Sequence, residues 1–236
     1  MKKYLVNYSD KTHKNSQIEN SKSALSIGGF DKVFSFNLQD LGEEFISENK
    51  SILSQHRGAG YWMWKPFVIK KALDLINYDD VLMYSDSGIS FIRNIDELVN
   101  IMDNTDEKLL LFELEDIHPN KRWTKRDCFV FMGIDNEPYL SQNQLLASYI
   151  LMKKNNFVIK FIDEWMNYSK DYRIITDSTN ECGLPNYSEF VDHRHDQSIL
   201  SLLGRKYNIK NIPDVSQFGN GRMITSQVFN HHRNRS

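Results

Sequence analysis

The chain has 236 residues, of which 40% are hydrophobic and 25% charged, a composition typical of one globular domain and not of a disordered or fibrous chain. Its 29 Lys and Arg against 31 Asp and Glu give a net charge of −2, so no overall positive field exists to collect nucleic acid. Two cysteines, Cys128 and Cys182, are too few for a four-thiolate zinc site or a disulfide framework, and we expect a cytoplasmic protein.

The first part of the chain predicts a strand, a helix and a second strand. Segments 3–8 and 31–37 are rich in strand-forming residues, and the polar stretch between them ends in Gly28-Gly29, which is typical of a helix stop. The apolar stretch at the start is too short for a secretion signal. We therefore expect the chain to open on a strand of the main sheet.

The middle of the chain predicts a helix over 66–76 followed by a central strand over 81–84. A proline is tolerated in the first turn of the helix, and the apolar residues after it recur at the spacing of one buried stripe: Ile69, Ala72, Leu73 and Ile76. The strand is an unbroken apolar run, VLMY, of the kind that is covered on both faces in parallel sheets.

Later segments continue the alternation of strands and helices. We expect helices over 94–102, 144–155 and 156–170, and strands over 108–114 and 128–132. This order, with continuous apolar strands, indicates an α/β fold in which helices flank a mostly parallel sheet in a single domain. No apolar run approaches the roughly 20 residues that cross a bilayer, although the basic tail could touch anionic lipid at a membrane surface or fold over a site.

Asp86 lies just beyond the apolar strand predicted over 81–84 and precedes Ser87 and Gly88. Ligands of open parallel sheets collect beyond the carboxyl ends of the strands. A carboxylate there, beside small residues that let a ligand approach the backbone, suits a divalent cation or a ribose hydroxyl. The alternative is an aspartate that only caps a turn or a helix.

The segment 192–197, DHRHDQ, precedes another apolar helical stripe. Asp196 as a helix cap is the simple interpretation. Capping does not explain two histidines and an arginine in five positions, whereas a site for sugar hydroxyls and a diphosphate would use all of them. We therefore favour a ligand site at this segment.

An aromatic segment over 56–66, HRGAGYWMWKP, combines rings, glycines and basic residues. The rings could stack on a base or a sugar while Arg57 and Lys65 neutralise phosphates, or the rings could pack the following helix onto the sheet. We expect both, with Trp62 or Trp64 in the core and Lys65 facing the ligand.

Two further polar groups have simple alternatives. Arg126 and Asp127 lie in the segment WTKRD and could pair with each other at the surface. His231 and His232 come near the end of the chain, where a free tail is the ordinary expectation. Adjacent histidines point apart in an extended chain, so we expect only one of them to reach any metal.

Five short segments follow one another along the chain: GYWMWKP (60–66), YSDSG (84–88), WTKRD (123–127), HRHDQSIL (193–200) and HHR (231–233). In this order they resemble a family of small GT-A-type glycosyltransferases from bacterial capsule or lipopolysaccharide clusters and large DNA viruses. That family is distantly similar to glycogenin-like enzymes. The resemblance covers almost the whole chain. It implies one GT-A-like, Rossmann-like domain over 1–236, with a nucleotide-binding part over 1–115 and an acceptor part with the C-terminal tail over 116–236.

The resemblance implies transfer of a sugar from a nucleotide-diphosphate donor, which we expect to be a UDP-sugar, to a glycan or lipid-linked acceptor with the help of Mn²⁺ or Mg²⁺. Asp86 would be the first aspartate of the metal motif Asp-x-Asp, but Gly88 stands in place of the usual second aspartate. The metal would then be held by Asp86, the donor diphosphate and His231 or His232, or it would be weak or dispensable.

The resemblance also suggests roles for the remaining candidates. Asp196, with Asp127 as second choice, would serve the sugar as the catalytic carboxylate, while Lys65, Arg126 and the metal would stabilise the leaving diphosphate. The expected nucleotide-sugar contacts come from both halves of the chain: Asn7, Tyr8, Trp62, Lys65, Ser87, His195 and Gln197.

Two other functions compete with glycosyl transfer. Because Gly88 interrupts the metal motif, the protein could be a catalytically inactive module that binds a nucleotide or a carbohydrate. A nucleotidyltransferase that builds sugar nucleotides is the nearest enzyme alternative, but residues 9–13 contain no glycine-rich loop. The spacing of the residues does not distinguish inverting from retaining transfer.

Overall fold

The computed structural model describes residues 1–115, 117–219 and 224–232. In this part of the chain, six strands form one sheet in the order β2-β1-β3-β6-β5-β7, and β4 (Ile89–Phe91) pairs with β8 (Phe229–His231) in a separate ribbon. Within the sheet, β6 is antiparallel to both of its neighbours and the other neighbouring pairs are parallel. The structure therefore confirms the predicted α/β class with a mostly parallel sheet. The strands of the sheet are β1 (Lys3–Tyr8), β2 (Lys32–Phe36), β3 (Val81–Ser85), β5 (Leu109–Glu113), β6 (Tyr149–Lys153) and β7 (Asn211–Pro213).

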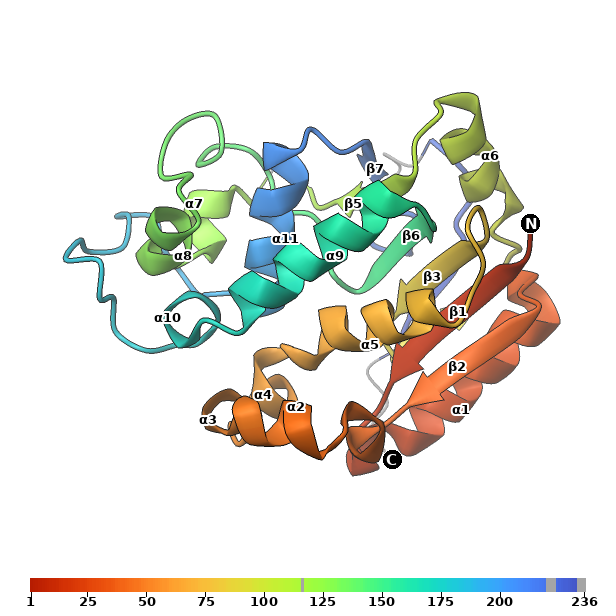
Figure 1. The fold of residues 1–236 in the computed structure, drawn as a ribbon. Coiled ribbons are helices and arrows are strands. Elements are labelled where there is room, and N and C mark those ends of the chain that lie inside the picture. The colour runs from red at the N-terminus through yellow and green to blue at the C-terminus, as the bar shows by residue number, and fades with distance from the viewer. Residues whose placement is uncertain (116, 220–223, 233–236) are drawn as a thin grey trace.

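Helices cover both faces of the sheet (Figure 1). On one face, α5 (Trp64–Asp74) packs against α9 (Asn156–Ser169), which packs against α11 (His195–Lys206). On the other face lie α1 (Lys14–Ser23), which continues as a π-helical turn to Gly28, and α6 (Asp96–Asn104). The predicted helices over 66–76, 94–102 and 156–170 are confirmed within two residues at each end.

The apolar strands divide their side chains between two hydrophobic cores. In β3, Leu82 and Tyr84 join the core beneath α5 and α9, whereas Val81 and Met83 join the core beneath α6. Successive side chains of a strand point to opposite faces, so a strand buried on both faces is apolar at successive positions and not only at alternate ones. This arrangement explains the continuous run at 81–84 and puts the carboxyl end of β3 at the centre of the sheet edge.

Two sequence-based predictions are wrong. Residues 128–132 are not a strand, because most of them belong to the helix α8 (Arg126–Phe131). Cys128 and Phe129 are buried in the same turn of this helix. Residues 144–155 are not a helix, because they contain β6. Their run of Leu, Ala and Met favours a helix by propensity, but insertion between β3 and β5 buries both faces of the segment and makes it a strand.

Shorter elements connect the main ones. Near the site these are α2 (Glu43–Glu48), α3 (Lys50–Leu53), α4 (Gly58–Tyr61), α7 (Asn120–Trp123) and α10 (Tyr172–Ile175), with 3₁₀ turns over Lys11–His13 and Leu38–Leu41. Among the described residues, none of these helices, nor any longer one, has the length and apolar character needed to cross a membrane.

Candidate active site

The sheet opens into a cleft where β3 ends and β6 begins. The backbone amide of Asp86, the residue after β3, donates to the carbonyl oxygen of Ser148 at 2.7 Å. Three cavities adjoin here, and Ser148 lines all three. We call them the large cavity (about 850 Å³), the central cavity (about 270 Å³) and the third cavity (about 420 Å³).

A buried ammonium joins the two principal carboxylates of the cleft. Lys65, in the first turn of α5, is 2% exposed. Its Nζ lies 2.6 Å from Oδ2 of Asp196 and 3.4 Å from Oδ1 of Asp86, and it donates to the carbonyl oxygen of Ala147 at 3.0 Å. Asp86 also accepts a hydrogen bond from the Tyr84 hydroxyl at 2.6 Å. The structure therefore brings Asp86 and Asp196, 110 positions apart in the sequence, to one central cavity.

Burial and charge perturb this cluster in a definite direction. Burial raises the pKa of Asp196 to about 6, although the ammonium of Lys65 opposes the shift. Burial also favours loss of the proton from Lys65, but the two carboxylates outweigh it and hold the Lys65 pKa above its ordinary value. At pH 7 the cluster thus contains a charged ammonium and a mostly ionised Asp196 carboxylate that takes up a proton just below neutrality.

The two histidines of the DHRHDQ segment have different surroundings. The Nε2 of His193 contacts the Ile174 carbonyl at 2.9 Å, and its Nδ1 accepts from the Lys125 amide at 3.2 Å, so the ring fastens two loops. His195 donates from Nδ1 to the Ile175 carbonyl at 2.7 Å and presents its ring to the central cavity beside Trp62. The expectation that both imidazoles serve a ligand is therefore wrong for His193.

Burial makes these imidazoles neutral. It lowers the pKa of His195 to about 4 and that of His193 well below its ordinary value. Their neighbours Arg194 and Gln197 face the cleft and line both the central and the third cavity. The Arg194 guanidinium lies 4.0 Å from the Trp123 ring centre, and the Gln197 amide donates to Gln144 at 2.7 Å.

The aromatic segment forms a strained loop over the large and central cavities. All five residues from Gly58 to Trp62 have positive φ angles, an arrangement that costs energy at non-glycine positions. Arg57 ties the loop to the opposite side through Asp192 at 2.6 Å and Asp177 at 3.1 Å. A side chain at Gly58 would place a Cβ 2.3 Å from the Trp62 ring, so the loop requires glycine there.

The two tryptophans divide as expected. Trp64 is buried and stacks on Tyr8 with ring centres 3.9 Å apart, whereas Trp62 is half-buried and lines the large and central cavities. Tyr8 and Ser87 also line the large cavity, and the Ser87 hydroxyl donates to the Tyr8 carbonyl. Lys65 lines the central cavity, and its ammonium is enclosed with the carboxylates and not held out toward solvent.

The C-terminal segment folds over the large cavity instead of forming a free tail. Through the β4-β8 ribbon, the His232 amide donates to the Gly88 carbonyl at 2.8 Å, and a Cβ on Gly88 would lie 2.8 Å from the His232 carbonyl oxygen. His231 and His232 line the same cavity as Asp86, while Arg233 lies outside the described residues. Glycine at position 88 is therefore what lets the tail pair beside Asp86.

The residues present fit a divalent cation only in part. Asp86 and His232 share the large cavity, and the ring nitrogens of His232 are buried without a hydrogen-bond partner. Within residues 1–115, 117–219 and 224–232, however, no group of three or more His, Cys, Asp or Glu side chains is arranged to hold a metal. Because Gly88 supplies no carboxylate, a cation here would need ligands from a bound molecule such as a diphosphate.

Asn7 does not reach the cleft. It is fully buried, and its carboxamide donates to Asn20 and Ser21 at 2.7 and 2.9 Å while accepting from Gln17 at 3.0 Å. This polar network fastens the hydrophilic helix α1 to β1. The predicted side-chain contact between Asn7 and a nucleotide is therefore corrected to a structural role.

Asp127 and Arg126 are also outside the three cavities. Asp127 is fully buried and accepts from the amides of Glu181 and Cys182 at 2.8 to 3.0 Å. Burial alone would raise its pKa, but these hydrogen bonds hold the Asp127 pKa below its ordinary value. Arg126 pairs with Asp135 at 2.8 Å and not with Asp127. Neither residue keeps the catalytic role predicted for it, because both hold loops together.

Sequence reasoning missed several residues of the cleft. Ser148 immediately precedes β6, just as Asp86 immediately follows β3, and the two antiparallel strands bring both residues to the same edge of the sheet. A correct prediction of β6 would have pointed to Ser148. His118, Asp214 and Phe218 line the third cavity from loops with no local motif, and no signal in the sequence identifies them.

Comparison with known proteins shows a similarity of fold to solved structures and no match of sequence to a family model. No protein-family model and no curated protein sequence matches the chain. Among solved structures, mouse xyloside xylosyltransferase 1 aligns over 98% of both chains with 11% identity and a TM-score of 0.52. A glycosyltransferase involved in glycosylation of the major capsid of PBCV-1 aligns over 98% of this chain and 93% of its own, with 9% identity and a TM-score of 0.52. The bifunctional glycosyltransferase WbbM aligns over 98% of this chain and 45% of its own, with 10% identity and a TM-score of 0.54. The chain therefore has the GT-A fold of these glycosyltransferases.

Proposed function

We propose that this protein is a glycosyltransferase that moves a sugar from a nucleotide-diphosphate donor, a UDP-sugar in our expectation, to a hydroxyl group of a glycan or lipid-linked acceptor. One observation carries the proposal: in a GT-A fold, the buried cluster of Asp86, Lys65 and Asp196 lines the central cavity at the end of the central strand, and Asp86 also lines the large cavity. Perturbed, buried titratable groups in a cleft mark candidate functional sites.

The large cavity suits the nucleotide of the donor. Its volume of about 850 Å³ is within the range of small-molecule sites. The half-buried Trp62 supplies ring surface for a base, and Arg57 supplies a guanidinium for the diphosphate. The central cavity, which contains Asp196 and Gln197, then receives the sugar to be transferred.

The chemistry requires opposite charges at the two ends of the broken bond. The bond from the anomeric carbon to the phosphate oxygen breaks, and its electron pair leaves with the nucleoside diphosphate. The acceptor oxygen bonds to the anomeric carbon, and its proton passes to water. The Asp196 carboxylate stabilises positive charge on the sugar, and the Arg57 guanidinium, which lines both the large and the central cavity, stabilises negative charge on the diphosphate. Lys65 holds Asp86 and Asp196 in place between the two.

We extend the proposal to Mn²⁺ or Mg²⁺, held by Asp86, one of the histidines His231 and His232, and the donor diphosphate. Such an ion would neutralise charge on the diphosphate when bound. Asp86 is 35% exposed at its side chain, which leaves one edge of the carboxylate open to the large cavity while Tyr84 and Lys65 bind the other.

A thermal-shift screen of nucleotides and nucleotide sugars, with and without Mn²⁺, tests the proposal, because a ligand that binds only the folded state stabilises it. We expect UDP with Mn²⁺ to raise the melting temperature and Asp86→Asn to remove the part that depends on Mn²⁺. The matched control is Asp106→Asn, which changes a fully exposed carboxylate on a distant turn. No shift with any nucleotide, or an equal Mn²⁺ effect in Asp86→Asn, would contradict the proposal.

The glycine at position 88 favours a second candidate, a nucleotide-sugar-binding protein without transferase activity. It predicts the same thermal shift as the transferase. Release of nucleoside diphosphate from the donor separates the two, since only the transferase produces it.

A further inference from the structure

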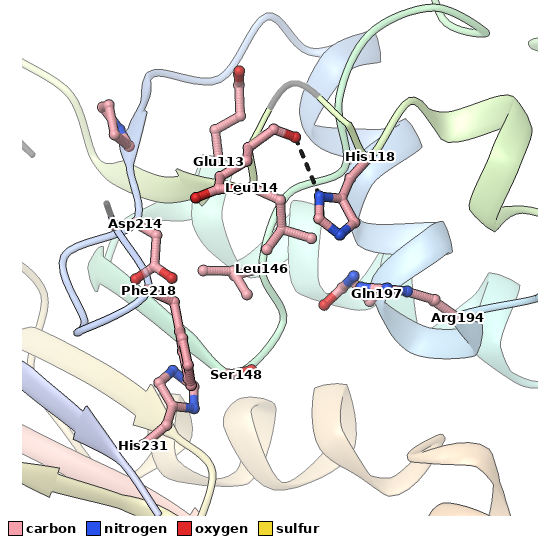
Figure 2. Close-up of a pocket in the computed structure, with 13 residues that line it drawn as sticks. Glu113, Leu114, His118, Leu146, Ser148, Arg194, Gln197, Asp214, Phe218 and His231 are labelled. Atoms are coloured by element: carbon pink, nitrogen blue, oxygen red, sulfur yellow. Dashed lines mark hydrogen bonds between the residues drawn. The ribbon is translucent and has the colours of Figure 1, made fainter. Parts of the chain in front are cut away.

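The third cavity is a separate compartment of the cleft. Figure 2 shows Asp214, Phe218 and His231 on one side of it, His118, Gln197 and Arg194 on the other, and Leu114 and Leu146 between them. It shares Ser148 with both other cavities, His231 with the large cavity, and Arg194 and Gln197 with the central cavity. A molecule bound here would therefore lie next to whatever the central cavity holds.

The lining of this cavity is net negative. Three carboxylates, those of Glu113, Glu115 and Asp214, line it with one guanidinium, that of Arg194. Outside the lining, Arg205 pairs with Glu113 at 2.6 Å and balances its charge, while Asp214 accepts hydrogen bonds from neutral groups of Tyr149 and Ser216. Burial lowers the pKa of His118, so its ring adds no positive charge near neutral pH. The guanidinium is moreover positioned over the Trp123 ring at 4.0 Å. Such a lining repels phosphate and carboxylate groups more than it repels a neutral ring.

The cavity also has an apolar surface of the right kind for a sugar ring. Phe218 is 51% exposed, an unusual state for a phenylalanine, and lies 5.7 Å from the His231 ring centre. Leu114 and Leu146 form the apolar floor. A site with apolar walls and a few fixed polar groups is typical of small-molecule recognition.

We infer that the third cavity binds the acceptor, and that the acceptor is a carbohydrate without negative charge on the ring that enters the cavity. The inference rests on the proposed function, because it takes the large and central cavities as the donor site. The hydroxyl group that attacks then reaches the anomeric carbon past Ser148 and Gln197, the residues at the boundary between the central and third cavities.

The test compares the binding of two pools of candidate acceptors to the protein saturated with UDP. One pool contains neutral p-nitrophenyl hexosides, and the other contains the matched p-nitrophenyl uronides. Saturation-transfer NMR reports binding, and transfer from the donor is measured with the same pools. We expect the neutral pool to bind and react, and the uronide pool to be at least tenfold weaker. Equal or better use of uronides, or no binding of any neutral glycoside, would overturn the inference.

Two variants test whether the selection of the acceptor depends on the third cavity. Phe218→Ala should raise the acceptor KM at least tenfold and change the donor KM less than twofold, because Phe218 lines only the third cavity. Glu115→Lys should reduce the preference for neutral acceptors at least tenfold. The matched control is Phe157→Ala, a partly exposed ring on α9 that lines none of the three cavities.

The failure of the inference can be told apart from the failure of the proposed function. If Phe218→Ala changes the donor and acceptor KM equally, or Glu115→Lys leaves selectivity unchanged, the assignment of the third cavity is wrong while nucleotide binding stands. If UDP does not bind and no donor is hydrolysed, the proposed function itself fails.

Discussion

Replacing Lys65 by methionine removes the ammonium that lies between the carboxylates of Asp86 and Asp196 in the central cavity. With Lys65 Nζ at 2.6 Å from Asp196 and 3.4 Å from Asp86, Coulomb attraction at an effective dielectric constant of 20 is on the order of 6 and 5 kcal/mol. Desolvation of the ammonium offsets much of this. Loss of one partner of a buried pair typically destabilises by about 3–5 kcal/mol, and we expect this range for Lys65→Met at pH 8.

The pH dependence of this loss is a second consequence. Without the ammonium, the Asp196 pKa rises further above about 6, so the folded state binds a proton more tightly than the unfolded state does. Stability of the variant then falls as pH rises from the unfolded pKa, near 4, through the raised folded pKa. The destabilisation should therefore be smaller at pH 5.5 than at pH 8.

Urea denaturation at the two pH values, followed by tryptophan fluorescence, measures both effects. The double variant Lys65→Met with Asp196→Leu should recover most of the stability, because it buries no uncompensated charge on Asp196. Lys70→Met, on the exposed side of the same helix and paired with Asp74, is the control and should cost less than about 1 kcal/mol. A loss below about 1 kcal/mol in Lys65→Met, or a double variant as unstable as the single one, would refute the reasoning.

Further predictions concern other parts of the site. Burial lowers the pKa of His195 from 6.5 to about 4, so the stability that the neutral ring contributes is complete above pH 6.5 and is lost as the pH falls from 6.5 to 4. We expect the free energy of unfolding to fall by about 2 kcal/mol between pH 7.5 and pH 5, and to depend less on pH in His195→Asn. Gly88→Ala should displace the tail at His232, costing about 1–3 kcal/mol and exposing the tail to limited proteolysis; an unchanged digest would contradict the proposed packing. Asp127→Ala should cost about 3 kcal/mol in urea denaturation, since it leaves buried amides unpaired, while the donor KM stays within twofold. Mn²⁺ alone should shift the melting temperature by less than about 1 °C, and UDP should be needed for a larger shift; an equal shift without UDP would mean that the chain holds the metal by itself.

The sequence predicts the parts of the fold that have a strong periodicity or a strong constraint. Helix α9 buries Val158, Phe161, Ile162 and Trp165 at helical spacing, and the first four residues of β3 are apolar because both faces of the strand are buried. The errors at 128–132 and 144–155 have a common physical cause. A short apolar run is compatible with a buried strand and with a buried helix, and the neighbours that it packs against decide between them.

The candidate site was predictable where a residue follows a strand or begins a helix. Asp86 and Asp196 could be found in this way, and the structure places them in one cavity. The burial of Asn7 and Asp127 could not be predicted, because their partners come from segments distant in sequence, Asn20 for one and the amides at 181–182 for the other. The enclosure of Lys65 depends on Ala147 in the same way.

The most direct measurement of the central claim is the release of nucleoside diphosphate from a panel of nucleotide sugars, with wild-type protein and with Asp196→Asn. The account predicts turnover of at least one donor by the wild type and a loss of about 100-fold or more in the variant, equivalent to about 2.7 kcal/mol of transition-state stabilisation, with the Kd for UDP within threefold. Equal turnover by Asp196→Asn, or no release from any donor by wild-type protein that binds UDP, would contradict it.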